Sequence, residues 1–120
     1  MNPRASVWLA ITFVLAAAGL AQGQTGKATF ADQCASCHPV GARSGPSGPT
    51  LRGVAWRKIA DRRDFAYSRA LSSVVGDWTP ARLDAYLANT EAFVPGTSMF
   101  YEMPDRAQRK ALIAYLQTLK

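Results

Sequence analysis

The chain has 120 residues, of which 48% are hydrophobic and 18% are charged, and its formal net charge is +6 at pH 7. This length allows at most one domain with a small core, which excludes a multidomain architecture. A basic chain of this size suits nucleic acid, anionic lipid or an acidic protein surface. No basic run contains interleaved aromatic residues, which argues against nucleic acid and favours an acidic protein partner.

Residues 1–21 are predicted to be a secretory signal peptide, and residues 22–120 the functional domain. Arg4 makes the start positive, residues 5–20 carry no charge, and Gly19 and Ala21 are the small residues that a signal peptidase requires. Cleavage after Ala21 predicts an exported, periplasmic protein with a net charge of +5, since 13 basic side chains remain against 8 acidic ones. The alternative is an uncleaved membrane anchor, because the uncharged run approaches the length of the shortest spanning helices.

A short helix expected from residue 26 to residue 35 leads into the sequence C-A-S-C-H, which contains both cysteines and the only histidine of the chain. C-x-x-C-H is the attachment pattern of a c-type haem, in which two thiols bind the porphyrin and the imidazole binds the iron. A structural zinc site needs about four ligands, and a thioredoxin-like pair needs a βαβ context. The motif therefore predicts one covalent haem, with Cys34 and Cys37 as attachment points and His38 as an axial ligand.

The chain after the motif alternates loops and helices. Residues 39–53 are rich in Gly, Pro and Ser, which predicts a loop with several turns against one haem face. A short helix is expected over residues 68–75 with Ser68 as its N-cap. The next helix has Thr79 as its N-cap and Pro80 as its first residue, and it should end near Asn89. Residues 91–103 are predicted to be an irregular loop.

The last helix is predicted to begin at Pro104 and Asp105 and to carry an apolar stripe for packing. The first helix is its natural partner, with Phe30 against Leu112 and Tyr115. No useful β alternation and no internal repeat appears in the sequence. We therefore expect an all-α fold, in which three main helices and long loops enclose one haem and the first and last helices cross.

The second axial ligand decides the class of function. An iron bound only by His38 would be open to peroxide or small ligands, whereas a six-coordinate iron suits electron transfer. The mature chain offers Met99 and Met103, both before the last helix. A thioether opposite a histidine favours the ferrous state and so raises the reduction potential.

Several further stretches form a pattern with the haem motif, namely Gly48-Pro49-Thr50-Leu51 with Gly53, Arg57-Lys58, Phe65-Ala66-Tyr67, Trp78, Tyr86, Pro95-Gly96-Thr97-Ser98-Met99 and Leu112-Ile113-Ala114-Tyr115-Leu116. With them the chain resembles class I c-type cytochromes, in the mitochondrial-like branch that includes soluble bacterial members. The resemblance runs from about residue 26 to the C-terminus. It implies a small cytochrome c fold around one haem c.

The resemblance also implies how the iron is held. Met99, at the end of P-G-T-S-M, corresponds to the distal ligand. Pro49 corresponds to the residue whose carbonyl accepts a hydrogen bond from the His38 imidazole, which orients the ring and raises its basicity. Tyr86 corresponds to a tyrosine that packs near the methionine sulfur.

A second group of matching residues is implied to hold the haem propionates. These are Arg57, Tyr67 and Trp78, with Thr97 as a further hydroxyl donor. A buried carboxylate needs hydrogen-bond donors and a cation near it, because without them its removal from water costs roughly several kcal/mol.

The chain departs from the family pattern at two places. Leu71 stands where many members have an asparagine that binds a buried water, so we expect a drier pocket. Mitochondrial members surround the haem edge with lysines, whereas this chain has Gln33, Glu91, Ala92 and Ser98 there. The partner of the mitochondrial members, a terminal oxidase that binds to these lysines of the cytochrome, is therefore not implied.

The function predicted from the sequence is that of a monomeric one-electron carrier, not an enzyme. It would shuttle electrons between periplasmic or membrane redox proteins, without binding nucleic acid. Two alternatives stay open: a five-coordinate haem protein with peroxidase or small-ligand activity, and a membrane-tethered relay that retains its N-terminal segment.

Overall fold

The computed structural model describes residues 25–120, so the predicted signal peptide lies outside the described residues. The chain is helical at residues 25–33 and then forms α2 (Arg69–Ser72), α3 (Pro80–Ala88), α4 (Thr90–Phe93) and α5 (Arg106–Leu116). Within these residues the only β pairing is one isolated bridge between Lys58 and Asp77. No helix in the same range is long and apolar enough to span a membrane. The all-α prediction is confirmed.

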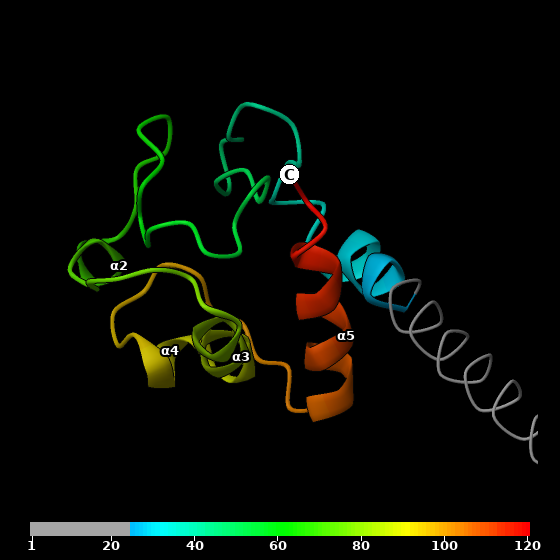
Figure 1. Ribbon diagram of the computed structural model, residues 1–120. Helices are drawn as coiled ribbons and strands as arrows, with labels where there is room; N and C mark the ends of the chain where they lie inside the picture. Colours follow the sequence, from blue (N-terminus) through cyan, green and yellow to red (C-terminus); the bar gives the residue numbers. More distant parts are fainter. Residues whose placement is uncertain (1–24) are drawn as a thin grey trace, which may run out of the picture.

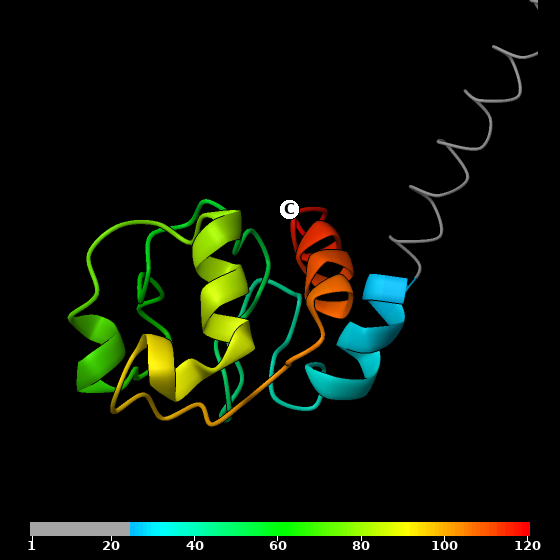
Figure 2. The same ribbon diagram turned by 90° about the horizontal axis from the view of Figure 1, so that it is seen from below.

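The first helix lies beside α5, as Figure 2 shows. A Cβ atom on Gly26 would stand 2.1 Å from the carbonyl oxygen of Ala111, so only glycine permits this approach of the two backbones. The rings of Phe30 and Tyr115 pack with centroids 5.3 Å apart. The predicted crossing of the first and last helices is therefore present.

The predicted N-caps Thr79 and Ser68 are confirmed. The side chain of Thr79 accepts a hydrogen bond from the amide of Arg82 at the start of α3. Asp105 does the same for Gln108 at the start of α5. Ser68 caps α2, but this helix ends at Ser72 and not at Val75. It is shorter than predicted because the chain turns back through Gly76, whose φ of 107° is not helical.

The prediction of an irregular loop over residues 91–103 is wrong at its start, where α4 forms. Asn89 explains the difference, because it ends α3 in an extended conformation with φ of −163°. Its side chain then accepts a hydrogen bond from the amide of Ala92 at 2.9 Å and caps the next helix. The chain from Val94 to Met103 is irregular, as expected.

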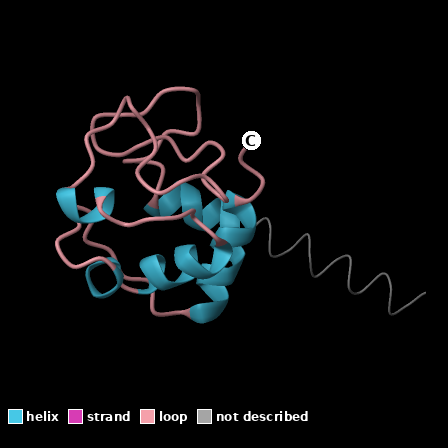
Figure 3. Cartoon of the chain, turned by 60° about the vertical axis from the view of Figure 1, so that its left-hand side comes forward, coloured by secondary structure: helices cyan, strands magenta, loops and turns pink. Residues whose placement is uncertain are grey.

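The helices and the long loop form two sides of the molecule (Figure 1, Figure 3). The loop between the first helix and α2 gathers on one side of the helices. The core lies between them and includes Leu112, which is fully buried, and Met103, which is 2% exposed. This arrangement leaves the space that the next section describes.

Candidate haem site

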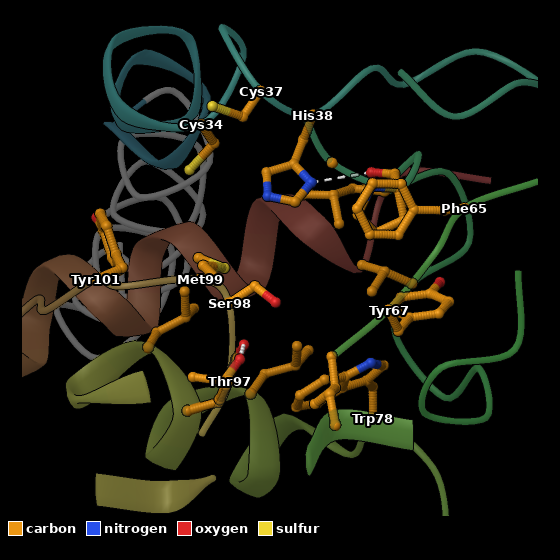
Figure 4. Close-up of a pocket in the computed structure, with 18 of the residues that line it drawn as sticks. Cys34, Cys37, His38, Phe65, Tyr67, Trp78, Thr97, Ser98, Met99 and Tyr101 are labelled. Atoms are coloured by element: carbon orange, nitrogen blue, oxygen red, sulfur yellow. Dashed lines mark hydrogen bonds between the residues drawn. The ribbon is translucent and has the colours of Figure 1, made fainter. Parts of the chain in front are cut away.

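A cavity of about 380 Å³ lies between the long loop and the helices. Figure 4 shows Cys34, Cys37 and His38 along one side of it and Thr97, Ser98 and Met99 along another. All ten residues that the sequence predicts for a haem site line this cavity, namely Cys34, Cys37, His38, Pro49, Arg57, Tyr67, Trp78, Tyr86, Thr97 and Met99. The fold thus brings together residues from seven separate stretches of the chain, between residues 34 and 99.

The two cysteines lie in the turn that follows the first helix. The amide of Cys34 donates to the carbonyl of Phe30 at 2.9 Å, and the amide of His38 donates to the carbonyl of Cys34 at 2.9 Å. Cys34 is buried and Cys37 is exposed. Burial, with a smaller effect from Cys37, raises the pKa of the Cys34 thiol to about 11. A thiol with such a pKa is protonated at neutral pH, unlike the thiolate of a dithiol oxidoreductase.

His38 is held in one orientation. Its Nδ1 lies 2.9 Å from the carbonyl oxygen of Pro49, which accepts a hydrogen bond from it. The proton is therefore on Nδ1, and Nε2 keeps its lone pair for a metal. Burial lowers the pKa of the imidazole, an effect that the bond to Pro49 partly opposes. The ring is thus neutral and oriented, and its free nitrogen suits a metal.

Gly48 makes room for this histidine, although the sequence pattern alone did not assign it that role. A Cβ atom there would lie 2.7 Å from the carbonyl oxygen of Cys37 and 2.7 Å from Nδ1 of His38. The loop can therefore return over the motif only if residue 48 has no side chain.

The two candidate methionines have different environments. Met99 is partly buried and lines the cavity. Met103 is not among the residues that line it; it is buried in the core, and its amide donates to the carbonyl of Leu87 at 2.9 Å. The hydroxyl of Thr90 fixes the Met99 backbone by donating to its carbonyl at 2.5 Å. Thr90 was not predicted, because no local pattern marks a bond to a residue nine positions away.

Arg57 provides a test of whether the cavity fits an acidic ligand. Its Nη1 donates to the carbonyl of Arg52 at 2.8 Å, and its Nη2 donates to the carbonyl of Thr50 at 3.0 Å. Its Nε is buried and has no hydrogen-bond partner within residues 25–120. An orphaned buried N–H is costly, so this atom calls for an acceptor that the chain does not supply. A haem propionate is such an acceptor.

Tyr67 and Trp78 lie near each other in the cavity wall, as Figure 4 shows. Trp78 is 7% exposed. The Tyr67 hydroxyl accepts a weak bond of 3.4 Å from the amide of Arg62, and burial is the main reason that its pKa is raised. Its hydroxyl hydrogen is therefore present at neutral pH and remains available for an acidic group.

Thr97 and Tyr86 form a buried pair, with 2.7 Å between their hydroxyl oxygens. Burial is the main reason that the pKa of Tyr86 is raised, so its phenol stays neutral. Around this pair the wall is mainly hydrophobic, as expected for a porphyrin, and includes Leu51, Val54, Leu71, Leu83, Leu87, Leu112 and Leu116. Leu71 is among them, and the drier pocket expected from it stays a prediction.

Residues 23–120 match the sequence family described as cytochrome c. The chain belongs to the cytochrome c family. It is similar to the cytochrome c-type cyt cy of Rhodobacter capsulatus, with 43% identity over 97 residues that cover 80% of this chain and 48% of that relative. It is also similar to the cytochrome c2 of Rhodoblastus acidophilus, with 40% identity over 91 residues that cover 73% of this chain and 84% of the relative.

A solved structure agrees with this assignment. Cytochrome cH from Methylobacterium extorquens superposes with a TM-score of 0.74 at 36% identity, covering 80% of this chain and 97% of that one. This chain spans about half the length of the Rhodobacter relative. Members of the cytochrome c family are electron carriers with one covalently bound haem c, and not enzymes. The chain is therefore a haem c electron carrier.

Proposed function

We propose that this cytochrome c carries single electrons between redox proteins with its haem iron held by His38 and Met99. When bound, haem c supplies a ferric/ferrous couple that accepts and releases one electron. The observation that supports this ligand pair is the lining of one cavity by both residues, whereas Met103 is buried outside it. Cys34 and Cys37 would hold the haem by thioether bonds.

The chain's part is to keep this pair fixed and its surroundings dry. Pro49 holds the imidazole through Nδ1, and Thr90 holds the backbone of Met99. Ligands that do not move during the cycle need little reorganisation, which favours fast electron transfer. The hydrophobic wall and the thioether both favour the ferrous form and raise the reduction potential.

The acidic groups of the haem would be bound at the other end of the cavity. Arg57 offers a free N–H and a positive charge, and Tyr67 and Trp78 offer further donors. Thr97 and Tyr86 would complete the polar wall between this end and Met99.

We further propose that the chain is exported to the periplasm and acts as a monomer composed of residues 22–120. The support is the signal-like composition of residues 1–21. Mass spectrometry of the purified protein should find a chain that begins at Gln22 and carries one haem. An intact Met1 end would instead favour a membrane-tethered relay.

The ligand assignment is tested by replacing each methionine. Met99→Ala should abolish the sulfur-to-iron charge-transfer band of the oxidised protein and give a high-spin spectrum. Met103→Ala should keep the band, although it should lower the free energy of unfolding by about 3 kcal/mol because it empties a buried site.

The opposite pattern, with the band lost only in Met103→Ala, would move the ligand to residue 103. A wild-type protein that lacks the band, is high-spin and turns over peroxide would replace the carrier by the five-coordinate alternative.

A further inference from the structure

The cavity opens to solvent between the haem motif and the segment that contains Met99. Most lining residues are buried or partly buried, and the exposed ones are Gln33, Cys37, Ser47, Ser98 and Phe100. None of these five is charged. Phe100 is 79% exposed and places an aromatic ring in water beside the opening. Aromatic residues are enriched in protein contact surfaces.

A second hollow adjoins this opening and carries negative charge. It is lined by Asn89, Thr90, Glu91, Phe100, Tyr101 and Glu102, and it shares Phe100 and Tyr101 with the cavity. The amide of Gly96 donates to Glu91 at 3.1 Å, and the side-chain amide of Asn89 donates to Glu102 at 2.6 Å. Both donors are neutral, so neither carboxylate is neutralised by an ion pair within residues 25–120.

The first helix adds a third acidic group on the other side of the opening. The hydroxyl of Tyr101 donates to the side-chain carbonyl of Gln33, which joins the first helix to the Met99 segment. Asp32, the residue before Gln33, is exposed. Gln33 lines the cavity, so Asp32 lies next to one of the residues at its opening.

The local charge of the opening is opposite to that of the whole chain. Residues 89–105 contain three acidic residues and no Lys or Arg. Residues 39–64 contain only two acidic residues against six basic ones, namely Arg43, Arg52, Arg57, Lys58, Arg62 and Arg63. Figure 1 shows the two segments at opposite sides of the molecule. Because exposed charges are screened beyond about 8 Å in physiological salt, a docked partner responds to the local charge.

We propose that Asp32, Glu91, Phe100, Tyr101 and Glu102, here called the mouth face, dock a redox protein whose apolar contact patch is surrounded by Lys and Arg. This inference rests on the proposed electron-carrier function. The positive net charge of the whole chain predicts an acidic partner. Most of this positive charge, however, lies in residues 39–64 and not at the mouth face. At the mouth face, charge complementarity requires a basic partner.

Binding of inorganic probes to the reduced, haem-loaded protein tests the mouth face directly. Hexaamminechromium(III), a paramagnetic cation, should broaden the NMR signals of residues 91 and 100–102. Hexacyanochromate(III) is an anion whose charge has the same magnitude, and it should broaden the NMR signals of residues 43–63. The proposal is overturned if the cation leaves the mouth face unaffected or if the anion prefers it.

Two double variants with the same net charge separate local from global effects. Glu91→Gln with Glu102→Gln should reduce cation broadening at Phe100 by about threefold or more at low salt. Asp61→Asn with Asp77→Asn, which lie outside the mouth face, should change it by less than about 1.5-fold. Equal losses in both variants would show that only the net charge acts.

Electron transfer to tris(phenanthroline)cobalt(III) separates failure of the docking surface from failure of the function. Each encounter oxidises one ferrous protein and reduces one cobalt(III) to cobalt(II). The rate should fall in the Glu91 and Glu102 variant and not in the control. If the wild type reacts and the two double variants react at the same rate, the docking role of the mouth face is wrong, and the carrier function stands. If no sample reacts with this oxidant or with ferricyanide, the proposed function itself fails.

Discussion

The loop after His38 and the segment around Met99 are each fixed by one buried threonine. Thr50 is fully buried; its hydroxyl donates to the carbonyl of Gly41 at 2.6 Å and accepts from the amide of Arg52 at 3.2 Å. Thr90 is 1% exposed, and its hydroxyl donates to Met99 and accepts from the amide of Tyr101 at 3.0 Å. Each hydroxyl thus satisfies backbone groups that no helix or strand pairs.

The two regions differ in what surrounds the threonine. In residues 39–64 polar side chains hold the chain: Asp64 binds Ser44 and Arg62, which in turn binds the carbonyl of Ala42. In residues 89–105 the side chains of Asn89 and Glu91 also accept backbone hydrogen bonds, and a four-residue helix and buried apolar side chains, such as Val94, add to them. A long loop without helices must satisfy its backbone through side chains, whereas a segment that begins as a helix satisfies much of it locally.

The largest effect is expected where the histidine-side loop passes over the motif. Gly48→Ala should lower the free energy of unfolding by about 3 kcal/mol, because the new methyl group collides with the backbone of Cys37 and with the His38 ring. Denaturant unfolding of the haem-loaded protein measures this loss.

Gly41→Ala is the matched control in the same loop, since a Cβ atom there meets nothing within 4 Å. Its effect should stay within about 0.5 kcal/mol. A similar loss of stability in both variants would mean that this loop needs glycine for its backbone freedom, and not for the close approach of residue 48 to Cys37 and His38.

A smaller effect is expected from removing either buried hydroxyl. Thr90→Val and Thr50→Val should each cost about 1 kcal/mol, because each removes the hydrogen bonds of one backbone carbonyl and one backbone amide. Only Thr90→Val should also weaken the sulfur-to-iron band, since only Thr90 holds the Met99 backbone. Loss of the band in Thr50→Val instead would show that the two regions do not hold their ligands independently.

The smallest effect concerns acid pH and only the histidine-side loop. Hydrogen bonds from Arg62 and Ser44 hold the pKa of the Asp64 carboxyl well below its usual value of 3.8. Their stabilisation is therefore complete above pH 3.8 and is lost progressively as the pH falls below it. From pH 5.5 to pH 3, amide protection factors in residues 44–64 should fall about threefold, with little change in residues 90–103.

Asp64→Asn should remove this pH dependence. Equal loss of protection in residues 90–103 would mean that acid loosens the whole fold and not the polar network of one loop.

The sequence predicted those features whose causes lie close together in the chain. The C-x-x-C-H turn, the caps Thr79 and Ser68, and the crossing of the first and last helices depend on a few neighbouring residues or on the side chains of one helix face. The family resemblance extended the prediction to ten site residues, all of which are among those that line the cavity. Their gathering there agrees with the predicted set, while their individual roles stay predictions.

The features that the sequence missed depend on contacts across the fold. Asn89 looked like the end of a helix, and its second role as the cap of α4 depends on its extended backbone. Nothing in the local sequence distinguishes Thr90 from a surface threonine, because its hydrogen bond to the Met99 carbonyl exists only in the folded chain. The contact between Gln33 and Tyr101 joins segments 68 positions apart, so no local pattern could reveal it.

The close approach of Gly26 to Ala111 also bears on how the chain reaches its fold. It joins the first described helix to the last one, and closing a chain segment of roughly 85 residues costs about 4 kcal/mol of entropy. The contacts within the first helix alone do not repay this cost, because an isolated helix gains most of its stability from tertiary packing. The first helix should therefore become stable only when α5 is present, so the two ends of the described chain should fold together and not one before the other.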